Sequence, residues 1–151
     1  MSLALESDKK EPLHIEADTV SIDNKAGTSR YEGHVNIWQG SSRLTSDTAL
    51  VYMDKDSSLK KAAAKGNLRA QAHYKTLTDP QKPELNAYAD IIEFYPKKHL
   101  IYLIGNAKVI QGKDSYKAPE IEYNTEKQRV FSKKSTHGRT VIVIHPSNSK
   151  H

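Results

Sequence analysis

The stretch Tyr31-Glu-Gly-His-Val-Asn-Ile-Trp-Gln-Gly40 decides the fold, because its pattern returns 72 residues later as Leu103-Ile-Gly-Asn-Ala-Lys-Val-Ile-Gln-Gly112. The same register extends upstream without a gap. Its seven identical pairs are Leu13/Leu85, Ala17/Ala89, Asp18/Asp90, Lys25/Lys97, Gly33/Gly105, Gln39/Gln111 and Gly40/Gly112. We interpret this as an internal duplication of one β unit.

Short segments with alternating apolar residues fill both copies, and turn residues separate them. This pattern predicts an all-β chain of antiparallel strands. The apolar parity shifts across Asp18, which indicates a bulge or corner in the strand. Asp47, Asp90 and Glu120 occupy comparable places, so we expect each of these carboxylates to hydrogen-bond backbone at a corner.

Composition favours one elongated domain over residues 12–146, with flexible segments at 1–11 and 147–151. Apolar residues make up only 36% of the chain, which favours a thin sandwich or an open roll over a thick core. With 23 basic and 18 acidic residues, the chain has a formal charge of +5. An anionic partner and an ordinary solvated surface both fit this charge.

Two segments leave alternatives open. Leu59–Lys65 followed by Gly66 suits a helix with a glycine stop, but the resemblance of Gly66-Asn-Leu-Arg-Ala to Gly105-Asn-Ala-Lys-Val favours a strand over 59–64. Near the end of the chain, Thr140–Ile144 contains four consecutive β-branched apolar residues, as in a strand covered on both faces. Such an end strand is either covered within one chain or pairs with the opposite end of another copy.

Catalytic and metal-binding patterns are weak. The seven histidines have no ligand spacing, and there is no cysteine, no Gly-x-Ser-x-Gly elbow and no phosphate-binding glycine loop. The acidic residues recur with the structural repeat, which is typical of corner residues and not of a catalytic pair. The sequence therefore predicts a protein that is not an enzyme and has no cofactor or metal.

By inward parity, small and medium apolar side chains line the interior of the predicted roll. In a closed sandwich they interdigitate, whereas in a roll that is open on one side they line a trough for acyl chains with lysines at its rim. The residues alone leave both alternatives open.

The phrases Pro12–Asp18, Tyr31–Gly40 and Ser46–Tyr52, and the second copy through Tyr123, together resemble the OstA-like family over residues 12–146. This resemblance implies an open, twisted antiparallel β-jellyroll of about sixteen strands that carries lipopolysaccharide in the periplasm. It implies three kinds of partner: the lipid A portion of lipopolysaccharide, further copies joined head to tail, and homologous β-jellyrolls at the inner-membrane transporter and the outer-membrane translocon. Nucleic acid is not an expected partner, and a periplasmic location presumes that a signal peptide is missing from this sequence.

Parity, together with the family's opening strand for the first two residues, predicts a lipid-binding groove of Leu13, Ile15, Val20, Ile22, Val35, Ile37, Val51, Leu68, Ile92, Phe94, Val109 and Ile121. The predicted end-to-end interface comprises Leu13, Ile15, Val141, Ile142, Val143 and Ile144. Two other functions remain open. A basic nucleic-acid module is weakened by the single Trp. A carbohydrate-active or carbohydrate-binding β-solenoid would use carboxylates such as Asp18 or Asp90.

Overall fold

The computed structural model describes residues 11–56, 58–124, 126–127 and 129–146. The predicted flexible segments at 1–10 and 147–151 lie outside the described residues. The strands are β1 (His14–Glu16), β2 (Thr19–Asp23), β3 (Thr28–Gln39), β4 (Ser42–Met53), β5 (Leu59–Lys65), β6 (Ala72–Thr76), β7 (Leu85–Ala89), β8 (Ile91–Tyr95), β9 (Leu100–Gln111), β10 (Asp114–Asn124), β11 (Arg129–Phe131) and β12 (Val141–Val143). A 3-10 turn, η2 (Pro96–Lys98), joins β8 to β9. No helix among these residues is long and apolar enough to cross a membrane.

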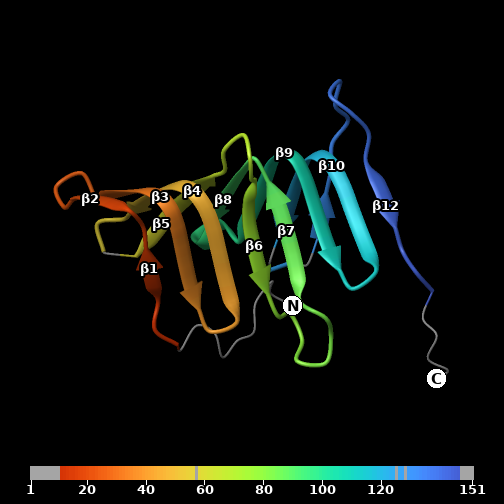
Figure 1. Ribbon diagram of the computed structural model, residues 1–151, viewed down its shortest axis with the longest axis horizontal. Helices are drawn as coiled ribbons and strands as arrows, with labels where there is room; N and C mark the ends of the chain where they lie inside the picture. Colours follow the sequence, from red (N-terminus) through yellow and green to blue (C-terminus); the bar gives the residue numbers. More distant parts are fainter. Residues whose placement is uncertain (1–10, 57, 125, 128, 147–151) are drawn as a thin grey trace.

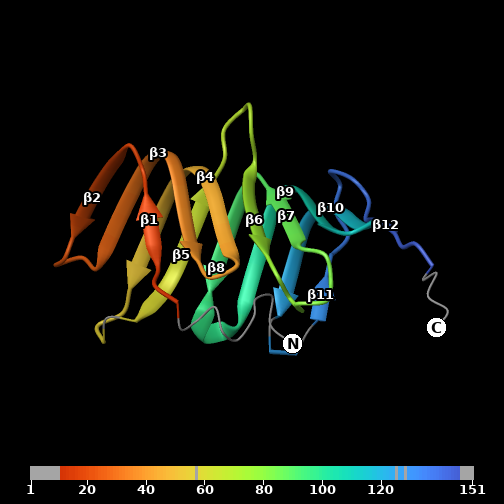
Figure 2. The same ribbon diagram turned by 60° about the horizontal axis from the view of Figure 1, so that its bottom comes forward.

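The strands form two antiparallel layers. Layer A contains β2, β5, β8 and β11, and layer B contains β1, β6, β7 and β12. The long strands β3, β4, β9 and β10 bend and run through both layers. Each layer therefore presents eight strand segments, which matches the predicted sixteen although the described chain has twelve strands. Figures 1 and 2 show layer B in front of layer A.

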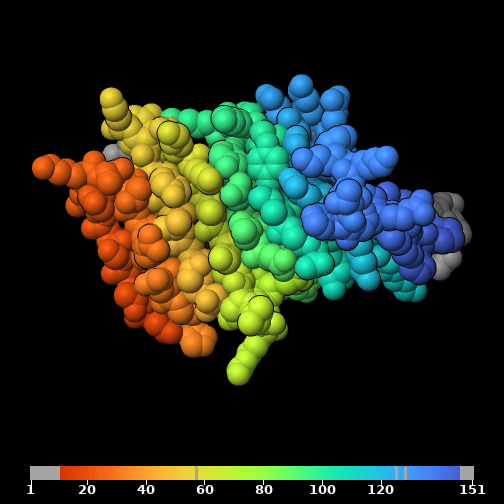
Figure 3. Space-filling model, turned by 90° about the horizontal axis from the view of Figure 1, so that it is seen from above, coloured from red at the N-terminus to blue at the C-terminus, as the bar shows by residue number. Residues whose placement is uncertain are grey.

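The duplication is visible in the strand bounds. β8 and β9 lie 72 residues after β2 and β3, and each pair has the same antiparallel pairing. Leu59–Lys65 is strand β5, between β4 and β8, so the prediction of a strand was correct. The long junction was also predicted, since no strand lies between Thr76 and Leu85. Successive strands advance along the long axis, from β1 and β2 at one end to β12 at the other (Figure 3).

The two layers meet along one side, where every bent strand turns. At this corner Gly33 and Gly105 have φ angles of 82° and 86°, and His34 and Asn106 have left-handed backbones as well. Along the opposite side the layers end in separate turns, such as residues 24–27 in layer A and 112–113 in layer B. The molecule is thus a roll that is joined at the corner and unjoined along its opposite edge.

Candidate functional site

The space between the layers is lined by rows of side chains that the strand register places opposite one another. Successive residues of a strand point to opposite faces, so directly paired residues share a face. In layer A the row next to the corner is Val20, Tyr31, Ala49, Ala64, Ile92, Leu103 and Ile121. The next row is Ile22, Ser29, Val51, Ala62, Phe94, Ile101, Tyr123 and Val130. In layer B the corresponding row is Ile15, Ile37, Leu44, Tyr74, Ala87, Val109, Tyr116 and Ile142.

Burial of these rows falls with distance from the corner. Beside the corner, layer B has the alanines Ala72, Ala89, Ala107 and Ala118, all buried, so the layers approach closely there. One row further out, Ile37, Phe94, Val109 and Tyr116 are only partly buried. The apolar interior is therefore wedge-shaped and becomes more accessible toward the unjoined edge.

One aromatic contact joins the two layers near the middle of the roll. The rings of Tyr74 in β6 and Phe94 in β8 meet edge to face, with 5.4 Å between their centroids. On the side toward the C-terminal end lies a cavity of about 220 Å³, lined by Tyr74, Leu85, Ile101, Val109, Tyr116, Tyr123, Val130 and others, with Lys82 at its polar margin. Burial raises the pKa of the Tyr123 phenol above its usual value. The cavity is smaller than a typical ligand pocket of roughly 300–1,000 Å³, so several acyl chains require the layers to separate.

The apolar rows reach the two ends of the roll without being covered. At one end Leu13, Val20 and Ile22 are exposed, and Ile15 stays 37% exposed. At the other end Val130 and Phe131 in β11 and residues 141–144 in and after β12 are all exposed. β12 pairs with β10 along one edge only. Within one chain, the expectation that Thr140–Ile144 is covered on both faces is therefore wrong.

Most of the predicted groove residues lie on the inner face. The register places Ile15, Val20, Ile22, Val35, Ile37, Val51, Ile92, Phe94, Val109 and Ile121 there. Leu13 precedes β1 and is exposed. Leu68 is not in the groove, because it lies in the loop between β5 and β6 on the corner side and is fully exposed.

Sequence reasoning missed several inner residues, namely Leu44, Tyr74, Ala87, Ile101, Leu103, Tyr116, Tyr123 and Val130. The repeat contained a signal for two of them, because Leu44 and Tyr116 are 72 residues apart and both face inward.

The corner carboxylates bind side chains. Asp18 Oδ2 lies 2.7 Å from His34 Nδ1, and Asp90 Oδ2 accepts a hydrogen bond from Asn106 Nδ2 at 3.3 Å. The prediction that these carboxylates bond backbone is wrong, because the backbone amides of Asp18 and Asp90 make the strand-crossing bonds, to the carbonyls of Gly33 and Gly105. The hydrogen bond to Asp18 and its negative charge raise the pKa of His34 above 6.5, and Asp47 adds to the effect.

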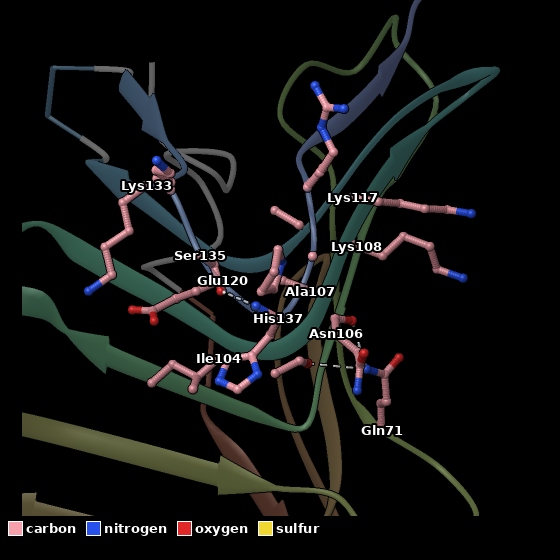
Figure 4. A pocket seen from close by; sticks show the side chains of 16 residues that line it. Gln71, Ile104, Asn106, Ala107, Lys108, Lys117, Glu120, Lys133, Ser135 and His137 are labelled. Atoms are coloured by element: carbon pink, nitrogen blue, oxygen red, sulfur yellow. Dashed lines mark hydrogen bonds between the residues drawn. The ribbon is translucent and has the colours of Figure 1, made fainter.

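A second hollow, of about 910 Å³, lies outside the corner between β9, β10 and the segment that leads to β12. Figure 4 shows Lys108 and Lys117 extending side by side away from it, while Lys133 lies on the other side near Glu120. Because these ammonium groups diverge, the hollow does not form a converging anion site.

The fold and the inner face define a class of protein: an open β-jellyroll whose apolar interior is a candidate lipid groove. Residues 14–129 match the family described as LptA/(LptD N-terminal domain) LPS transport protein. The chain belongs to this family.

Two relatives support the assignment. The lipopolysaccharide export system protein LptH of Pseudomonas aeruginosa is 32% identical over 136 residues, covering 90% of this chain and 76% of that protein. LptA of Escherichia coli K12 is 26% identical over 144 residues, covering 94% of this chain and 76% of LptA. The crystal structure of LptH, the LptA-homologous periplasmic component of the lipopolysaccharide transport device in P. aeruginosa, superposes with a TM-score of 0.81 at 30% identity, covering 93% of this chain and 99% of that structure.

Proposed function

We propose that this protein is a periplasmic carrier of lipopolysaccharide that holds the acyl chains between its two layers. The observation that carries the proposal is the wedge-shaped apolar interior, whose side chains become more accessible toward the unjoined edge. The family assignment supports the ligand, since the related LptH and LptA are lipopolysaccharide export proteins.

Partial enclosure suits a carrier. Each fully buried methylene contributes about 0.8 kcal/mol, so complete enclosure of several acyl chains would make release slow. A groove that is open along one edge leaves part of each chain exposed. The 220 Å³ cavity beside Tyr74 and Phe94 is the start of such a groove, and lipid binding then widens it.

We further propose that copies join head to tail into a bridge between the inner and outer membranes, with homologous jellyrolls at its two ends. The exposed apolar residues of β1 and β12 support this arrangement. A strand edge with unpaired backbone groups and no charged side chain favours pairing with another chain. Because the two ends differ, such a contact is heterologous and continues into a filament.

The groove can be tested by photo-crosslinking. A photoreactive amino acid at Ile37 or Val109, on the inner face, is expected to capture lipopolysaccharide, whereas one at Lys25, in the exposed turn after β2, is not. The readout is a lipopolysaccharide adduct detected by immunoblotting. Equal capture at Lys25 and Val109 would contradict a groove between the layers.

The alternative of a carbohydrate-active β-solenoid makes a different prediction: replacing Asp18 or Asp90 abolishes turnover and leaves the fold intact. In the structure both carboxylates hold corner side chains, which favours a structural role for them.

A further inference from the structure

The outer face of layer B carries positive charge. The register assigns sixteen positions to this face: His14, Glu16, Asn36, Trp38, Arg43, Thr45, His73, Lys75, Asn86, Tyr88, Lys108, Ile110, Ser115, Lys117, Val141 and Val143. Four of them are Lys or Arg, and only Glu16, at the edge of the sheet, is acidic. The positive charge is therefore unopposed across the centre of the face.

The outer face of layer A differs. Its strands direct outward the acidic residues Asp23, Glu32, Glu93, Glu120 and Glu122 together with the cations Arg30, Lys61, Lys65 and Arg129. Some of these charges pair with each other, as Lys61 does with Glu93 at 3.7 Å. The two sides of the roll thus have different electrostatic character, and layer B is the cationic side.

Two aromatic rings on the layer B face are flanked by cationic or imidazole groups. The His14 ring stacks on Trp38 with 4.8 Å between centroids, and the Arg43 guanidinium lies 5.4 Å from the same ring. These partners come from β1 and β4, the strands on either side of β3.

The second group is built in the same way. The His73 ring stacks on Tyr88 with 4.3 Å between centroids, and Lys108 Nζ lies 5.1 Å from that ring. The partners come from β6 and β9, which flank β7. Because neighbours already occupy both sides of each ring, neither ring has a face free to stack on a sugar or a nucleobase.

We propose that the outer face of layer B docks on a bilayer surface of anionic phospholipids. Lys and Arg attract anionic headgroups, and Trp and Tyr favour the headgroup level of a membrane. Strands are about 4.8 Å apart, so Arg43, Lys75, Lys108 and Lys117, on β4, β6, β9 and β10, spread over roughly 20 Å. That spacing suits several headgroups at once better than a single phosphate. The face lies outside the groove, so this proposal does not depend on lipopolysaccharide carriage.

The test compares two variants with the same change in charge. Arg43→Gln, Lys75→Gln, Lys108→Gln and Lys117→Gln together lower the formal charge from +5 to +1, and so do Lys25→Gln, Lys55→Gln, Lys60→Gln and Lys65→Gln, which lie off this face. In sedimentation with phosphatidylglycerol/phosphatidylcholine vesicles, we expect at least about a tenfold loss of binding for the first variant only. Salt should weaken binding of the unmodified chain, and pure phosphatidylcholine should not bind it.

The unmodified chain offers an independent readout, because Trp38 is its only tryptophan. Brominated anionic lipids should quench Trp38 fluorescence if this face meets the bilayer. Absence of quenching under conditions of full binding would overturn the proposal. So would equal losses in the two variants, or stronger binding to an oligonucleotide or an acidic polysaccharide than to the vesicles.

Discussion

Gly33 and Gly105 show why the corner sequence is repeated. A side chain at either position meets the carboxylate of Asp18 or Asp90 well inside van der Waals contact, and both backbones have a positive φ. Only glycine combines that conformation with the missing Cβ. The close approach brings each carboxylate within reach of the residue that follows the glycine, His34 or Asn106.

Gly33→Ala is expected to destabilise the chain by about 1–3 kcal/mol, because it adds both backbone strain and a clash with Asp18. The measurement is urea unfolding followed by circular dichroism. Adding Asp18→Ala removes the clash but leaves the strain, so the Gly33→Ala loss should be smaller in that background. An unchanged unfolding midpoint in the single variant would contradict this account of the corner.

His34 makes the first corner sensitive to pH, whereas Asn106 leaves the second corner insensitive. The Asp18 carboxylate raises the pKa of His34 above 6.5 in the folded chain. Protonation is therefore favoured by folding: the stabilisation is fully present below pH 6.5 and is lost as the pH rises through the folded value. His34→Asn, which copies the second corner, should remove this contribution.

The expected result is a small gain in the melting temperature of the unmodified chain relative to His34→Asn as the pH falls from 8 to 6. The effect is small because the His34 side chain is 90% exposed and solvent screens the pair. Parallel melting curves for the two chains across this range would show that the Asp18 contact contributes nothing.

At the scale of elements, the repeat predicted what local pattern alone left ambiguous. Leu59–Lys65 has the composition of a helix, yet its alanines pack as a strand between β4 and β8, where Ala64 is buried. Small side chains suit this position because the layers are close beside the corner. The tertiary environment overrides intrinsic helix propensity here.

Other features were beyond the sequence for a physical reason. Alternation assigns a face within one strand but not the partner strand, so it could not show that β3, β4, β9 and β10 each belong to both layers. Parity also fails wherever the chain leaves the sheet. Leu68 was predicted inward by such parity, but the segment from Gly66 to Gln71 crosses between layers on the outside.

On the scale of the whole molecule, three surfaces have separate chemistry: the apolar interior, the cationic outer face of layer B and the two uncovered ends. The inward row of layer B runs without interruption from Ile15 at one end to Ile142 at the other. If copies join end to end, Ile142 of one copy continues this row into Ile15 of the next. The groove would then be continuous through the joint.

Ile142 and Val143 allow a matched test of that joint. Both are exposed in the single chain, but Ile142 pairs with Tyr116 and faces the interior, whereas Val143 pairs with Ser115 and faces outward. Ile142→Lys places a charge in the apolar seam and should raise the concentration needed for assembly at least about tenfold, which corresponds to roughly 1.4 kcal/mol. Val143→Lys keeps its charge in solvent and should assemble nearly as the unmodified chain does. Light scattering after size exclusion over a concentration series would show a ladder of masses for the unmodified chain and Val143→Lys, and a shift toward monomer for Ile142→Lys. A strict monomer at every concentration, or equal effects of the two lysines, would contradict end-to-end joining through the inward row.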